Sequence, residues 1–62
     1  MNTKIIEFNK RMIGKRILVV SEEYEGPAKI VEVIDEENFL VQTKDSQKFE
    51  VSMFDIRSLE NA

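Results

Sequence analysis

The stretch from Lys48 to Ser52 alternates strictly between polar and apolar residues, and this pattern most constrains what the chain can fold into. In an extended backbone, Phe49 and Val51 fall on one face and the polar residues on the other. Such alternation is typical of an antiparallel strand with one buried face. Because an isolated hairpin is only marginally stable in water, the pattern predicts further strands that cover this face.

Four other segments fit such strands. Ile17–Val20 is apolar and mostly β-branched, Ala28–Ile34 continues in the same style, and Phe39–Thr43 alternates. Met53–Asp55 is too short for an α-helix and predicts a single 3₁₀ turn. It precedes a short final strand at Ile56–Leu59, after which residues 60–62 are expected to fray.

The second of these strands has apolar residues on both faces. Ala28, Ile30 and Ile34 share one face, whereas Val31 and Val33 share the other. This distribution predicts a bend or a bulge, as a strand that serves two sheets would need.

The first thirteen residues have a different pattern. Their apolar residues fall near a helical stripe, which comprises Ile5, Ile6, Phe8, Met12 and Ile13. Asn2 or Thr3 is a candidate cap, and Gly14 is a candidate stop. A short strand at Lys4–Phe8 is the competing interpretation, and the helix or irregular arm is favoured. The domain organisation expected is an arm at residues 1–13 and a barrel at residues 14–62.

Five short strands, a long first loop, two tight hairpins and a one-turn link before the last strand resemble the Src-homology-3-like barrel, in the broad sense that includes KOW and Tudor domains. The resemblance covers residues 14–60. Gly26, Lys29, Val31 and Ile34 fall at the spacing of the KOW pattern, although Lys29 stands where that pattern has a second glycine. The tail "VSMFDIRSL" is similar to the end of such barrels. The resemblance implies an all-β, five-stranded barrel with a short N-terminal helix or arm.

The chain contains no cysteine and no histidine, which argues against a disulfide framework, a zinc site of the usual kind and the common catalytic pairings. Carboxylate pairs such as Glu22 with Glu25, or Asp35 with Glu37, fall in predicted turns, where a solvated surface is the ordinary explanation. The segment from Asp35 to Asn38 lacks the loop glycine and downstream glutamate of a calcium loop. We therefore expect no enzyme, no metal and no cofactor.

The longest apolar run, Ile17–Val20, is far shorter than the roughly 18 residues of a membrane span. The N-terminus lacks the apolar core and small-residue cleavage site of a signal peptide. The sequence therefore predicts a cytoplasmic protein that does not contact membranes.

Charge is distributed unevenly along the chain. Residues 1–16 carry five basic residues and one acidic residue, a net of +4, whereas residues 17–62 carry four basic and eleven acidic residues, a net of −7. The whole chain therefore has a net charge of −3. A field of one sign attracts opposite charges and excludes like charges, so this division bears on the choice of partner.

The acidic part suggests a protein partner with a basic surface. The loop "SEEYEGP", residues 21–27, presents Tyr24 among carboxylates as a potential anchor. The favoured hypothesis is a small acidic inhibitor or adaptor, similar in size and charge to inhibitors encoded by phages and mobile elements. Its predicted partner-binding residues are Glu22, Glu23, Tyr24, Glu25, Asp35, Glu36 and Glu37. In the competing interpretations, Tyr24 folds back over the barrel, and the acids only keep the protein soluble.

The basic part suggests the alternative, a KOW-like or Tudor-like nucleic-acid-binding or transcription-associated module. Its predicted contacts are Lys10, Arg11, Lys15, Arg16 and Lys29. The simpler interpretation is that the arm cations solvate one face of a helix. A homo-oligomer is the third interpretation, in which one exposed residue among Met53, Phe54 and Ile56 joins Met12 and Ile13 in an apolar patch. The simpler account is that the N-terminal arm completes the core of the barrel.

Overall fold

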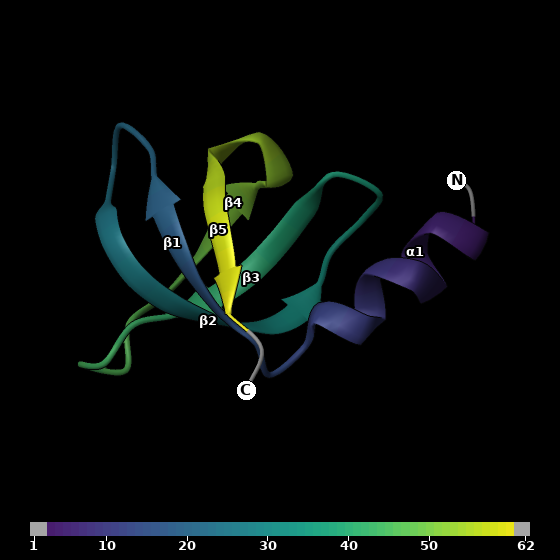
Figure 1. Ribbon diagram of the computed structural model, residues 1–62, viewed down its shortest axis with the longest axis horizontal. Coiled ribbons are helices and arrows are strands. Elements are labelled where there is room, and N and C mark those ends of the chain that lie inside the picture. Colours follow the sequence, from purple (N-terminus) through teal and green to yellow (C-terminus); the bar gives the residue numbers. More distant parts are fainter. Residues whose placement is uncertain (1–2, 61–62) are drawn as a thin grey trace.

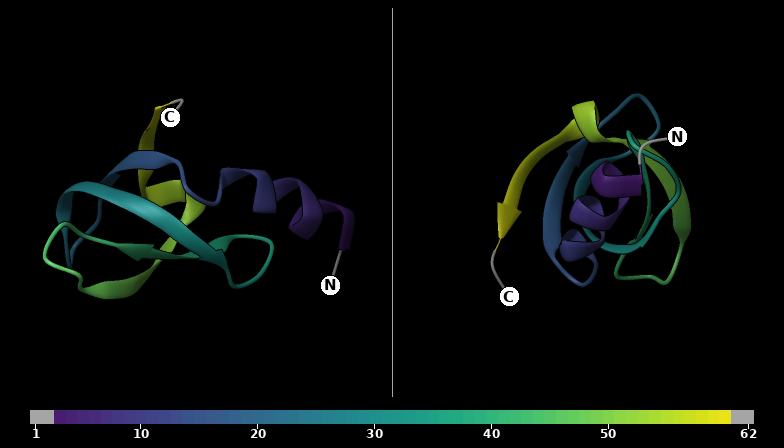
Figure 2. Two further views of the ribbon diagram at one scale, coloured as in Figure 1. Left: turned by 90° about the horizontal axis from the view of Figure 1, so that it is seen from below. Right: turned by 90° about the vertical axis from the view of Figure 1, so that its right-hand side faces the viewer.

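Five antiparallel strands form one sheet in the order β4-β3-β2-β1-β5 (Figure 1). The strands are β1 (Arg16–Val20), β2 (Glu25–Val33), β3 (Asn38–Gln42), β4 (Lys48–Ser52) and β5 (Ile56–Glu60). This computed structural model describes residues 3–60. The predicted all-β class with a short N-terminal helix is confirmed. The sheet curls around its core, with β4 and β5 as its two edge strands (Figure 2).

The side chains that alternate inward from the first four strands make up the core. They are Ile17, Val19, Ala28, Ile30, Phe39, Val41 and Val51. Phe49 is half-buried and packs against this cluster. The alternation of β3 and β4 therefore predicts the buried face correctly, and the bounds expected for β4 are those observed.

Strand β2 begins earlier than the sequence suggests. Glu25, Gly26 and Pro27, expected to lie in a long first loop, pair with the second half of β1. Proline has no N–H to donate, and it is tolerated here because β3 pairs with β2 only from Lys29 onward. The expected long loop is therefore wrong, and the connection is Ser21–Tyr24 alone.

The predicted irregularity in β2 is confirmed. The register between β2 and β3 shifts between Ile30 and Glu32. Beyond this bulge, Val33 packs against the core and Ile34 is exposed. The assignment of Ile34 to the face of Ala28 and Ile30 is therefore wrong, because an extra residue reverses which side chains point inward.

The N-terminal segment forms helix α1 (Thr3–Asn9), which continues as the 3₁₀ helix η1 (Lys10–Met12). The helix is thus observed instead of the competing strand. It projects from one end of the curled sheet (Figures 1 and 2). Gly14, at a φ of +91°, lies in the left-handed region and turns the chain toward β1. The candidate cap Asn2 lies outside the described residues.

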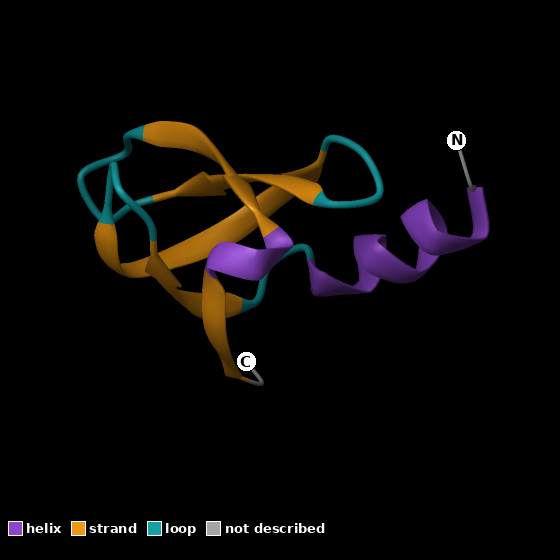
Figure 3. Cartoon of the chain, turned by 90° about the horizontal axis from the view of Figure 1, so that it is seen from above, coloured by secondary structure: helices purple, strands orange, loops and turns teal. Residues whose placement is uncertain are grey.

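A second 3₁₀ helix, η2 (Met53–Asp55), connects β4 to β5, as predicted (Figure 3). The hydroxyl oxygen of Ser52 accepts a hydrogen bond from the backbone N–H of Phe54 at 3.2 Å, which caps this turn. Glu60, which was expected to fray, is instead the last residue of β5 and lies opposite Arg16. The remaining residues of that expectation, 61 and 62, lie outside the described part of the chain.

Candidate functional site

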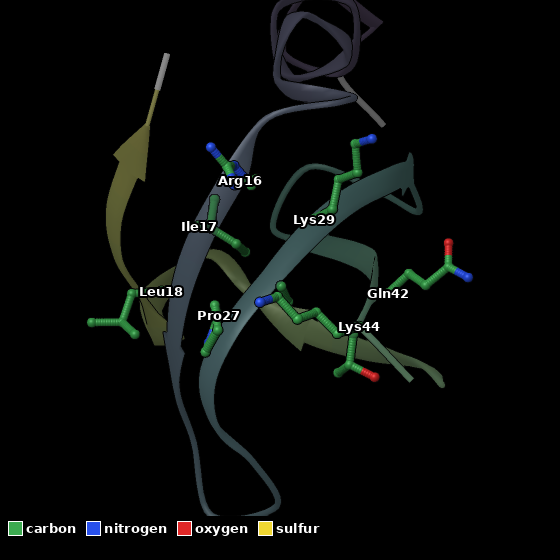
Figure 4. A pocket seen from close by; sticks show the side chains of 9 residues that line it. Arg16, Ile17, Leu18, Pro27, Lys29, Gln42 and Lys44 are labelled. Atoms are coloured by element: carbon green, nitrogen blue, oxygen red, sulfur yellow. The ribbon is translucent and has the colours of Figure 1, made fainter. Parts of the chain in front are cut away.

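An open groove of about 530 Å³ crosses β1, β2 and the end of β3 (Figure 4). Its lining combines cationic, amide and apolar side chains. The residues are Arg16, Ile17, Leu18, Pro27, Ala28, Lys29, Gln42, Thr43 and Lys44. Three cations from three separate parts of the chain thus surround one hollow.

The register of the sheet creates this arrangement. Arg16 of β1 lies opposite Lys29 of β2, and Lys29 lies opposite Gln42 of β3. Ile17, which follows Arg16, and Ala28, which precedes Lys29, are both buried. Because successive side chains of a strand point to opposite faces, the two cations are on the solvent face. Like charges directly opposite each other destabilise a sheet. On its other side, Arg16 lies opposite Glu60 of β5, so the row formed by Arg16 and Lys29 begins beside a carboxylate-bearing residue.

The turn between β3 and β4 brings Lys44 to the same groove. The backbone N–H of Thr43 donates to the carbonyl of Gln47 at 2.9 Å, and that of Ser46 donates to the carbonyl of Thr43 at 3.0 Å. The Thr43 hydroxyl also donates to the Asp45 carboxylate. Thr43 is buried, so this bonded turn fixes the start of the loop that carries Lys44.

Chemically, the groove is suited to an anionic ligand with an apolar part. Guanidinium and ammonium groups bind phosphate and carboxylate oxygens through charge-assisted hydrogen bonds. Leu18 and Pro27 also line the groove, and their exposed side chains offer an apolar surface.

The structure divides the predicted basic residues. Arg16 and Lys29 are brought together, whereas Lys10 and Arg11 lie on η1. The Arg11 guanidinium carbon lies 5.7 Å from the centre of the Phe8 ring, in a cation–π arrangement. Lys15 precedes β1, and its carbonyl accepts a hydrogen bond from the N–H of Ile30 at 3.0 Å.

Tyr24 is folded back onto the sheet. Its hydroxyl donates to the carbonyl of Pro27 at 2.7 Å, and its ring centre lies 5.1 Å from that of Phe49. The side chain is half-buried and packs against the core. The sequence left two interpretations open, an exposed anchor for a partner and a side chain folded back onto the domain. The structure shows the second.

The predicted acidic residues form two separate groups. Glu22, Glu23 and Glu25 lie at the start of β2, whereas Asp35, Glu36 and Glu37 lie beyond its end. Glu25 is the first of the nine residues of β2, and the rest of the strand lies between the two groups, so these acids do not make one continuous surface along this hairpin.

Asp35 organises the turn between β2 and β3. Its Oδ1 accepts hydrogen bonds from the backbone N–H groups of Glu37 at 2.9 Å and Asn38 at 3.0 Å, and from the Asn38 side chain at 2.9 Å. The bond from Glu37 and then that from the Asn38 side chain lower the pKa of Asp35 below its ordinary value of 3.8. The carboxylate therefore has a clear structural role.

Comparison with known proteins gives no relative, because no family model, curated protein or solved structure matches the chain. None of the helices in residues 3–60 is long and apolar enough to cross a membrane. Within residues 3–60, no three acidic side chains gather as a metal site would require.

Of the nine lining residues, sequence reasoning named Arg16 and Lys29 as binding residues and missed the other seven, among them Pro27 and Lys44. Lys44 was assigned to a turn and Pro27 to a loop, so neither was linked to Arg16. The only information that joins them is the register between strands, which depends on where β2 begins and where it bulges.

Proposed function

We propose that the protein is a non-enzymatic module that binds a short single-stranded segment of nucleic acid in the groove. The observation that carries the proposal is the row formed by Arg16 and Lys29 on adjacent strands, with Lys44 in the same hollow. The strand order β4-β3-β2-β1-β5 and the η2 link also support assignment to the Src-homology-3-like barrels, in their KOW-like or Tudor-like variety.

The ligand follows from the chemistry of the row. Two cations on adjacent strands can both make charge-assisted hydrogen bonds to one polyanion, whose negative charge offsets their mutual repulsion. Successive phosphates of one strand offer such charges, and Gln42 adds an amide that can both donate and accept hydrogen bonds. The apolar surface of Leu18 and Pro27 suits the faces of sugars and bases.

The distribution of acids favours a short, single-stranded ligand over a duplex. Acidic residues flank β2 at both ends, and the whole chain has a net charge of −3. A long duplex would bring many phosphates close to these carboxylates, whereas a short strand needs only the groove.

The acidic-surface hypothesis receives less support from the geometry. The hydroxyl and ring of Tyr24 are both engaged within the domain, and the carboxylates are divided between two places. Protein binding therefore enters the test as the competing outcome.

Fluorescence anisotropy with short labelled single strands of RNA and DNA, titrated over a range of salt concentrations, tests the proposal. Three phosphate contacts predict that the logarithm of the binding constant falls against that of the salt concentration with a slope of about −2. Lys29→Ala should weaken binding and reduce this slope by about 0.7. Lys10→Ala removes the same charge from η1 and serves as the matched control.

Two results would overturn the proposal. The first is an absence of binding to either strand at low salt. The second is equal loss on Lys29→Ala and Lys10→Ala, since that would mean overall charge and not the groove determines binding. A labelled polyglutamate peptide, titrated in parallel, should bind more weakly than the nucleic-acid strands. If the peptide bound more tightly than the strands, the ligand of the groove would be an acidic protein.

A further inference from the structure

Helix α1 leaves apolar surface uncovered. Phe8 is 58% exposed, and Ile13, just after η1, is 45% exposed. The C-terminal end of the segment is anchored to the sheet: Asn9 is buried, its Nδ2 donates to the carbonyl of Glu36 at 3.0 Å, and Met12 packs against the core. A helix of seven residues is well below the length that is stable alone in water, so a covering surface would stabilise it.

A second apolar surface lies at the same end of the molecule. The backbone N–H of Met53 donates to the carbonyl of Glu37 at 2.6 Å, which joins η2 to the turn between β2 and β3. The bond from Asn9 joins α1 to that same turn. Phe54 of η2 is 68% exposed, and Met53 is also exposed. Figures 2 and 3 show α1 projecting beyond this end of the sheet.

The charges of the two surfaces are complementary. The helical segment presents Lys10 and Arg11 beside Phe8, whereas the turn next to η2 contains Asp35, Glu36 and Glu37. The helical segment also carries Lys4 and Glu7, and the other surface also carries Asp55 and Arg57, whose guanidinium donates to the carbonyl of Phe54 at 2.9 Å. One surface is thus apolar with an excess of cations, and the other is apolar with an excess of carboxylates. Such pairs attract each other and fix the register of docking.

We infer that α1 and η1 of one molecule dock on η2 and the 35–37 turn of a second copy, so that the protein forms a two-fold symmetric dimer. Both surfaces lie at one end of the same chain, which is the condition for a self-complementary interface in which each copy supplies both halves. The dimer covers Phe8 and Phe54 and pairs Lys10 and Arg11 with Glu36 and Glu37. This interface is independent of the groove.

Sedimentation equilibrium from low micromolar to millimolar protein tests the inference. The mass should rise toward twice the 7.3 kDa of one chain. Phe8→Glu and Phe54→Glu should each return the mass to that of one chain, with an unchanged circular dichroism spectrum. Leu18→Glu places the same charge on an exposed apolar position of β1 and should leave the dimer intact.

A charge exchange gives the sharper test. Lys10→Glu/Arg11→Glu and Glu36→Lys/Glu37→Lys should each be monomeric alone, because like charges meet across the interface. Mixed in equal amounts, the two variants should form a heterodimer, since each helix then faces a turn of opposite charge. A parent chain that stays monomeric throughout the range, or a mixture that stays monomeric, would overturn the inference.

Discussion

The hydroxyl of Tyr24 donates a hydrogen bond to the carbonyl of Pro27 at 2.7 Å and so ties the first loop to strand β2. A Cβ atom added at Gly26 would lie 3.0 Å from this hydroxyl, so the glycine between the two residues leaves room for the bond. The tyrosine that the sequence presents as a possible anchor for a partner thus closes the first hairpin.

Tyr24→Phe tests this structural role. The variant keeps the ring on Phe49 and loses one hydrogen bond, so its free energy of unfolding should fall by about 1 kcal/mol. Urea unfolding measures the change, and anisotropy should show unaltered nucleic-acid binding. A variant that unfolded like the parent but no longer bound its ligand would restore Tyr24 to the role of an anchor.

The row on the sheet predicts opposite effects of one substitution on stability and binding. Lys29→Glu replaces a like-charge neighbour of Arg16 with an opposite charge, so the free energy of unfolding should rise by about 0.5 kcal/mol. The same change puts a carboxylate in the groove and should abolish nucleic-acid binding. Urea unfolding and anisotropy on one preparation measure both effects.

Lys48→Glu is the control for that substitution. Lys48 lies opposite the uncharged Gln42, so the variant makes the same change in net charge without relieving a like-charge pair. It should gain no stability. If Lys48→Glu and Lys29→Glu were equally stabilised, the gain would come from overall charge and not from the row.

Local patterns were sufficient to predict most of the sheet. Alternation in β3 and β4 gives the buried face directly, and the apolar residues on both faces of β2 indicate the bulge near Val31. The direction in which the bulge shifts the pattern is not local, which is why Ile34 was assigned to the wrong face. It depends on how β2 pairs with β3.

The groove depends even more on pairing between strands. Arg16 and Lys29 are thirteen positions apart, and only the register makes them neighbours. That register places Pro27 inside a strand, although proline and glycine usually mark a loop. The stretch "EGPAKIVEVID" therefore contains a strand that begins earlier than its glycine and proline suggest. The solvent face of this strand carries Lys29, one of the three cations of the groove.

Asp35 predicts a pH dependence with a defined sign. Hydrogen bonds in the folded protein lower its pKa below 3.8, so the charged form is favoured by folding. The resulting stability is fully present above the ordinary value and is lost as the pH falls through the folded pKa. Asp35→Asn does not titrate, so its deficit in Tm relative to the parent should be larger near neutral pH than in acid.

An NMR titration of the Asp35 carboxyl carbon measures the folded pKa directly. The midpoint should lie below 3.8. A midpoint at or above that value, or a Tm difference that does not change with pH, would contradict the hydrogen bonding described for the turn.

Val51→Asp tests the core. Val51 is only 3% exposed and lies on β4 opposite Phe39, which is fully buried. A carboxylate there would have no partner among the core residues, and burying an unpaired charge costs several kcal/mol. A domain of this size has about 5 kcal/mol to spare, so the variant should be unfolded at room temperature. Lys48→Asp puts the same side chain on the solvent face of β4, and its circular dichroism melt should stay close to that of the parent. A cooperative parental melt for Val51→Asp would mean that β4 presents its other face to the core.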